Sequence, residues 1–179
     1  MSELWHLERL DTGERTTLKR ASGSLEFNAP ALRAFYKADA CREDGWERQR
    51  YAAMCMACLW NEQDNPPTLP MQECLRRMCW IDNELQQGMA KRIDVLLETR
   101  WGNDDYLIGK LLNLVRMIKS KGEFRPDFEL LAVDMRRWNY ESRIVQREWL
   151  RTIYKTAFDE KKQESNEKDD NKEVTDYDA

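Results

Sequence analysis

The sequence predicts an all-α protein made of two small helical bundles packed together, followed by a disordered acidic C-terminal tail. Apolar side chains recur at spacings of three and four residues through most of the chain, which places them on one face of each of a series of helices. The 179 residues include only seven glycines and five prolines, too few for the many turns of an all-β fold. Charged residues make up 35% of the chain and apolar residues 41%, a balance that fits a soluble helical protein with a modest core.

Residues 1–70 are predicted to form the N-terminal bundle and a proline-rich linker. Ser2 is expected to cap a short helix that runs to residue 10, and a second short helix is expected over 14–20. Asn28 at the N-cap and Pro30 in the first turn predict the start of a helix over 30–38. The most apolar helix of this half spans 46–60. The segment 61–70, with two adjacent prolines at its centre, then ends the bundle.

Residues 71–158 are predicted to form the C-terminal bundle. Helices are expected over 71–80, over 82–99 with Leu85 on the apolar face, and over 106–120, where Gly122 suits the C-terminal end. Two further helices are expected on either side of Asn139 and Tyr140. The first buries Phe128, Leu131, Met135 and Trp138, and the second buries Val145, Trp149 and Ile153.

The charge of the chain is unevenly distributed. Residues 159–179 hold nine Asp/Glu and four Lys, a net charge of −5, with almost no apolar side chains, which predicts a disordered acidic tail. Residues 106–158 hold eleven Lys/Arg and six Asp/Glu, a net charge of +5. The overall net charge of −4 therefore conceals a basic C-terminal half.

A line of cations marks the last predicted helix. Arg143, Arg147, Arg151 and Lys155 repeat every four residues, on roughly the opposite side from its apolar face. Like charges at this spacing repel by about 0.2–0.5 kcal/mol per pair, and few acids compensate them. Two interpretations stay open: a helical module that contacts nucleic-acid phosphates, or an adaptor whose arginines meet acidic protein surfaces. A helix-turn-helix repressor is a weaker third, because no short two-helix unit with base-reading side chains can be placed.

Neither catalysis, nor a cofactor, nor a metal is expected. His6 is the only histidine, and the chain lacks a Gly-rich phosphate loop, an HExxH pair and a GxSxG turn. Five cysteines cannot form a complete disulfide framework, and Cys55 and Cys58 lie in an apolar helical run, which indicates buried thiols rather than zinc ligands. No apolar run is long enough to span a membrane and the N-terminus lacks the apolar core of a signal peptide, which predicts a cytoplasmic protein.

Four segments, taken in order, resemble the small subunit of the type I-E CRISPR Cascade complex, the CasB family. They are LERLDTGERTTLKRA, APALRAFYKA, LVRMIKSKG and DMRRWNYESRIVQREWLRTIY, distributed over residues 3–158. The resemblance implies an all-helical fold of two bundles without catalytic activity. It also implies two copies lying head to tail along crRNA-bearing subunits, with contacts to the target and displaced DNA strands. The protein then supplies charge and shape, while the guide RNA reads the sequence.

The resemblance also assigns nucleic-acid-binding residues. In the family, such basic residues follow the turn near the N-terminus, open the first long helix and lie in the C-terminal bundle. In this sequence those positions correspond to Lys19, Arg20, Arg50, Arg92, Arg116, Lys119, Arg136, Arg137 and Arg143, to which the line of cations adds Arg147 and Arg151. The chain departs from the family where Leu112 replaces an arginine. The acidic tail is a second departure, interpreted as an inert solubilising segment, with competition for the basic face as the alternative.

Overall fold

The computed structural model describes residues 4–22, 24, 26–40, 45–60, 66–102 and 105–155. Its α-helices are α1 (Thr12–Ala21), α2 (Ala29–Ala38), α3 (Glu47–Ala57), α4 (Met71–Cys79), α5 (Gln87–Glu98), α6 (Tyr106–Lys121), α7 (Phe128–Arg137) and α8 (Ile144–Leu150). A 3₁₀ turn η1 (Leu7–Arg9) and a π-helical turn η2 (Arg151–Lys155) flank them. The strands β1 (Thr68–Leu69), β2 (Trp80–Ile81), β3 (Glu84–Leu85) and β4 (Arg125–Pro126) have two residues each. The predicted all-α fold is therefore confirmed. The predicted acidic tail lies outside the described residues.

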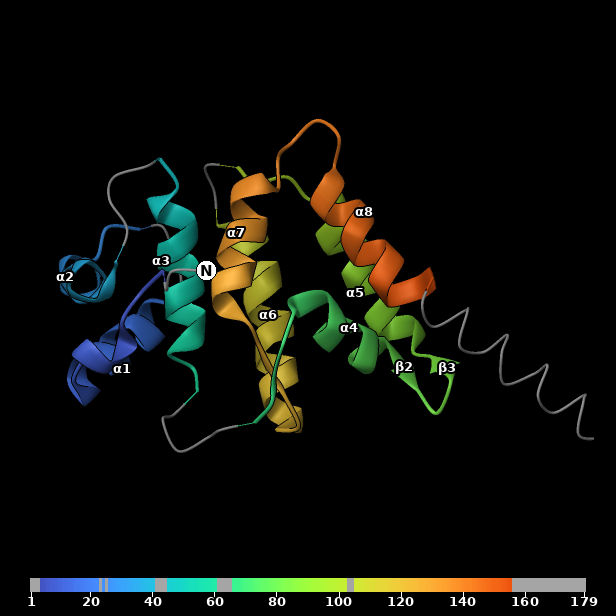
Figure 1. Ribbon diagram of the computed structural model, residues 1–179, viewed down its shortest axis with the longest axis horizontal. Coiled ribbons are helices and arrows are strands. Elements are labelled where there is room, and N and C mark those ends of the chain that lie inside the picture. The colour runs from blue at the N-terminus through green and yellow to red at the C-terminus, as the bar shows by residue number, and fades with distance from the viewer. Residues whose placement is uncertain are drawn as a thin grey trace, which may run out of the picture.

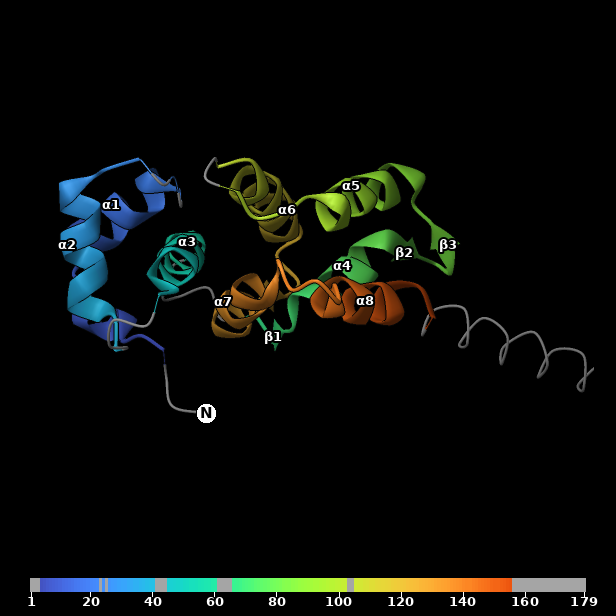
Figure 2. The ribbon, with the colours of Figure 1, turned by 90° about the horizontal axis from the view of Figure 1, so that it is seen from above.

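The helices form an elongated molecule (Figure 1). Helices α1 and α2 lie at one end, and α5, α8 and the β2–β3 hairpin lie toward the other. Viewed from above, α5 and α6 make one side of the C-terminal half, while α7 and α8 make the opposite side (Figure 2). These two sides carry different sets of the predicted binding residues.

The N-terminal segment differs from its prediction. Its described part begins with an extended stretch in which Trp5 pairs with Asp39 in an antiparallel bridge, and the only helical turn is η1. The amide of His6 donates to the carbonyl of Ala38 at 2.8 Å, so the main chain of this stretch is satisfied by α2 rather than by its own helix. The next helix starts two residues earlier than predicted, because Asp11 and Glu14 form a capping box.

Helix α3 links the two halves of the chain. Its residues from Arg50 to Met56 are all buried, because other elements surround this part of the helix on every side. It packs against α1 in the N-terminal half and most extensively against α7 in the C-terminal half. The buried apolar residues form one hydrophobic cluster that runs through both halves. The N-terminal and C-terminal halves of the chain thus share one hydrophobic core.

A hairpin replaces the start of one predicted helix. Asp82 and Asn83 both have positive φ, 50° and 60°, and they form a two-residue turn between β2 and β3. Such a turn matches the twist of paired strands, and Asn and Asp tolerate this backbone conformation. The prediction of a helix over 82–99 was therefore wrong for its first five residues. Leu85 lies in β3, and α5 begins only at Gln87.

The junction between α7 and α8 depends on two buried tryptophans. Trp138 and Trp149 meet edge to face, with ring centroids 5.2 Å apart. The indole nitrogen of Trp138 donates to the carbonyl of Thr99 at 2.9 Å, and that of Trp149 donates to Oδ2 of Asp134 at 2.9 Å. Both indole N–H groups therefore have a hydrogen-bond acceptor inside the core, as burial of an indole requires.

Asp134 should make the stability of the protein depend on pH. Burial raises the pKa of its carboxyl, and the Trp149 hydrogen bond and nearby Arg137 oppose this shift only in part. The folded state then holds the proton more tightly than the unfolded state, so the stability that Asp134 contributes is greatest below its ordinary pKa of 3.8. That stability is lost as pH rises through the raised pKa. Urea unfolding across this interval should show the wild type losing stability relative to Asp134→Asn, and parallel pH profiles would contradict this assignment.

The described cysteines are buried thiols, as predicted. Cys55, Cys58, Cys74 and Cys79 are buried and form no disulfide, and burial raises the pKa of Cys58 to about 11 and that of Cys74 to about 12. Such thiols stay protonated and are poor metal ligands. Among the described residues, no group of three His, Cys, Asp or Glu side chains is placed to hold a metal ion. None of the described helices combines the length and apolar character needed to cross a bilayer.

Candidate nucleic-acid interface

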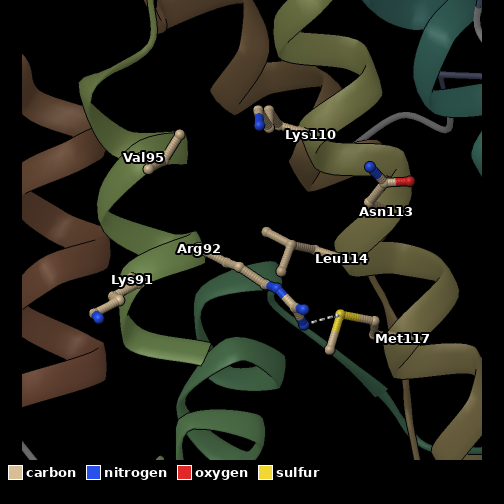
Figure 3. A pocket seen from close by; sticks show the side chains of 7 residues that line it. All are labelled: Lys91, Arg92, Val95, Lys110, Asn113, Leu114 and Met117. Atoms are coloured by element: carbon tan, nitrogen blue, oxygen red, sulfur yellow. Dashed lines mark hydrogen bonds between the residues drawn. The ribbon is translucent and has the colours of Figure 1, made fainter. Parts of the chain in front are cut away.

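A basic groove separates α5 from α6 (Figure 3). Lys91 and Arg92 of α5 and Lys110 of α6 line it, and its apolar lining comes from Val95, Leu114 and Met117. Arg92 reaches across toward α6, where its Nη1 lies 3.2 Å from Sδ of Met117. The groove has a volume of about 610 Å³. The packing of α5 beside α6 thus brings cations from two separate parts of the chain into one groove.

The charges of this groove are not neutralised by their surroundings. No carboxylate lines it, and none of its three cations forms an ion pair with any described residue. Asp94, an acid of α5, does not line the groove and instead interacts electrostatically with Tyr154. Uncompensated cations in a concave site raise the local concentration of anions. The groove is therefore chemically suited to a polyanion.

A second cluster of cations lies where α1 ends beside α6. Nη2 of Arg116 is 3.5 Å from Oγ of Ser22, the left-handed residue that terminates α1. Lys19 and Arg20 occupy the last turn of the same helix and are exposed. Cations there also favour the helix dipole, which is a purely structural reason for their position. The structure nevertheless places Arg116 beside the end of α1, whose last turn holds Lys19 and Arg20 more than ninety residues earlier in the sequence.

Helix α6 connects the two clusters. Lys110, Asn113 and Arg116 follow one another at spacings of three, so they lie on neighbouring turns of its outward surface. In Figure 2, α1, α6 and α5 succeed one another along one side of the molecule. We call the six cations of this side the α6 basic face: Lys19, Arg20, Lys91, Arg92, Lys110 and Arg116. Of these, Lys91 and Lys110 were not predicted from sequence, because only the packing of α5 against α6 relates them.

Arg50 is not accessible to a ligand in this structure. Its side chain is 1% exposed, and its Nε and Nη2 donate to the two carboxylate oxygens of Asp39 at 3.0 Å each. Its guanidinium also lies over the ring of Trp46, 4.8 Å from the centroid. The prediction that Arg50 binds nucleic acid is corrected accordingly, since the residue closes a buried ion pair between α2 and α3.

Three more predicted residues are engaged with the protein itself. Lys119 donates to the carbonyl of Leu59 and lies over the ring of Trp60, so it ties α6 to the end of α3. Arg137 is 3.9 Å from the carboxylate of Glu148. Arg136 is exposed but stacks on Trp46 at 4.9 Å, on the ring that Arg50 also covers. Of these, only Arg136 is exposed.

The predicted line of four cations on the last helix is not continuous. Arg143 precedes α8 in a left-handed conformation, with φ of 52°, and donates to the carbonyl of Leu97. The helix then widens into η2 at Arg151, so a spacing of four no longer returns to the same side. Arg147 and Arg151 stay exposed and form no ion pair with any described residue. They lie on the α7–α8 side, opposite the α6 basic face.

Comparison with known proteins gives consistent matches. The family model described as CRISPR-associated protein Cse2 matches residues 14–154. A chain of a solved structure titled "CRISPR RNA-guided surveillance complex" superposes with a TM-score of 0.67 at 19% identity, covering 86% of this chain and 88% of that one. The structure titled "Crystal structure of M. ruber CasB" gives a TM-score of 0.65 at 19% identity, with coverages of 87% and 92%. No curated protein matches the chain.

Proposed function

The chain belongs to the CRISPR-associated protein Cse2 family, and from this premise we propose that it is a non-catalytic subunit of an RNA-guided surveillance complex. In that role it holds nucleic-acid backbone without reading base sequence and stabilises the R-loop. The family membership agrees with the resemblance carried by the four sequence segments. Similarity to a chain of a surveillance complex supports the same assembly for this protein.

The observation that carries the proposal is the groove between α5 and α6. It presents Lys91, Arg92 and Lys110 without any lining carboxylate. Lysine acts on phosphate as a point charge, and arginine adds planar hydrogen-bond donors. Neither requires a particular base. The groove and the cluster at the end of α1 therefore suit a strand whose sequence is read elsewhere, by pairing with the guide.

A second contact surface accompanies the first on the α7–α8 side. Arg147 and Arg151 are exposed next to Leu150 and Ile144, which are 39% and 38% exposed. Cations mixed with apolar side chains favour a protein neighbour over a phosphate backbone. We assign this surface to other subunits of the complex or to a second copy of the chain. A purely structural adaptor would use both surfaces in this way, and it is the alternative function.

The proposal is tested by expressing the chain together with the other subunits and the crRNA of its complex. It should copurify with them, and native mass spectrometry should give about two copies per complex, as the family resemblance implies. The purified complex should retain target DNA less well when this subunit is omitted. A complex that assembles and holds target DNA equally well without this chain would overturn the proposal.

A further inference from the structure

The α5–α6 groove combines positive charge with apolar walls. Val95 is 42% exposed although it lines the groove, and Met117 is partly buried beside it. A sugar–phosphate backbone can match the three cations but offers little to these two apolar side chains. A peptide that carries both carboxylates and apolar side chains would match all of them.

The C-terminal sequence contains such a peptide. All four lysines of residues 159–179 precede position 173. The six residues that follow, Glu173–Asp178, read EVTDYD and hold three carboxylates without a cation. They also include Val174 and Tyr177, the only large apolar side chains of the tail. Charge and apolar content are thus concentrated in one short stretch.

The chain leaves the described structure on the α7–α8 side, through the turn η2, which packs on α4. Tyr154 of this turn interacts electrostatically with Asp94 of α5, and Asp94 lies between the groove residues Arg92 and Val95 in sequence. Seventeen residues lie between Lys155 and Glu173. At ~3.3 Å or more per residue they extend to about 60 Å, whereas an α-helix with its side chains is only ~10–12 Å across. The segment can therefore pass around α5 and reach the groove of its own chain.

We propose that residues 173–178 dock into the α5–α6 groove of the same chain and compete there with nucleic acid. The inference rests on the proposed function of the groove and adds a regulation to it. Covalent linkage to the same chain gives the segment an effective concentration of the order of millimolar, so weak contacts suffice for occupancy. A long strand, which engages more cations, displaces the segment. Docking thus selects against short or adventitious polyanions.

A photo-crosslinker can locate the segment in the full-length protein. With Tyr177 replaced by p-benzoylphenylalanine, irradiation should attach position 177 mainly to Met117 or Val95. An excess of single-stranded oligonucleotide should suppress this product. Mixing isotopically light and heavy protein distinguishes attachment within one chain from attachment to a second copy. Products scattered over the surface, or formed between copies, would overturn the proposal.

Charge-neutral variants of the full chain test the competition. Each of two triple variants removes three negative charges from residues 159–179. The first neutralises the docking segment through Glu173→Gln, Asp176→Asn and Asp178→Asn. The second is the control outside that segment and carries Asp159→Asn, Glu160→Gln and Glu164→Gln. At 50 mM salt the first should tighten oligonucleotide binding about 3- to 10-fold, and the second less than about twofold. At about 0.3 M salt, where the Debye length is only ~6 Å, the first effect should shrink toward none.

The outcomes separate this inference from the proposed function. Equal tightening by both triple variants would reduce the tail to a general electrostatic effect and refute docking. In that case the proposed function would stand. If no variant binds oligonucleotide at all, the proposed function fails, and the crosslinking pattern still decides whether the segment occupies the groove.

Discussion

Replacing Asp39 with asparagine should lower the free energy of unfolding by about 3 kcal/mol or more. The substitution leaves the guanidinium of Arg50 buried at 1% exposure without its negative partner. Removing one member of a buried ion pair is far more damaging than removing both, because the remaining charge has lost its water and has no compensation. Urea or thermal unfolding of the variant, monitored by circular dichroism, measures the loss.

The matched control for Asp39 is Glu14, which pairs with Lys37 at 2.7 Å on the surface of the same bundle. Glu14→Gln keeps the hydrogen-bonding capacity of the capping box and should be close to wild type, since exposed ion pairs contribute little. The double variant Asp39→Asn with Arg50→Gln should recover part of the lost stability. Equal effects of Asp39→Asn and Glu14→Gln would show that the Arg50 pair is not a buried interaction in solution.

Arg50 also illustrates what sequence reasoning could not see. Its place at the start of the most apolar helix was correctly predicted, but its partner lies eleven residues away across a loop. Helical periodicity relates residues three or four apart and says nothing about such a pair. A cation aligned with a family's binding residues was therefore assigned to the surface, whereas the tertiary structure buries it.

The helices were predictable where local chemistry specifies them. Asn28 and Gly122 mark helix ends that the structure reproduces, because a side-chain cap and a left-handed glycine act within one turn. The hairpin at Asp82 and Asn83 was missed, since an apolar pattern at helical spacing overrode a turn signal of only two residues. The π-helical turn at Arg151 was missed for a different reason. It depends on how the chain packs on α4, which no local pattern records.

The binding surface was predictable only in part. Lys19, Arg20, Arg92 and Arg116 were assigned through family resemblance, and the structure leaves them exposed. The groove is lined by Arg92 together with Lys91 and Lys110, and sequence reasoning assigned neither lysine to a binding site. Net charge by segment located the basic half of the chain. Which surface each of these cationic side chains faces could be known only from the packing of α5 on α6.

Neutralising the groove should weaken binding to a single-stranded oligonucleotide about a hundredfold at 0.1 M salt. The variant carries Lys91→Gln, Arg92→Gln and Lys110→Gln, which retain helix propensity and remove three charges. Each phosphate contact on a single strand contributes about −0.7 to the slope of log affinity against log salt. If the six cations of the α6 basic face engage one strand, the wild-type slope should be about −4. The variant should then have a slope of about −2, with little dependence on base sequence in either protein.

The matched control for the groove variant removes three charges from the opposite side of the molecule, through Arg147→Gln, Arg151→Gln and Lys155→Gln. Net charge changes equally in the two variants, so a loss caused only by long-range attraction would appear in both. We expect the control to keep the slope within about one unit of wild type, since these cations lie on the α7–α8 side. It should instead impair copurification with the complex, as the exposed Leu150 beside them indicates a protein contact. The reverse result, with the control losing oligonucleotide binding and the groove variant losing assembly, would exchange the roles of the two surfaces.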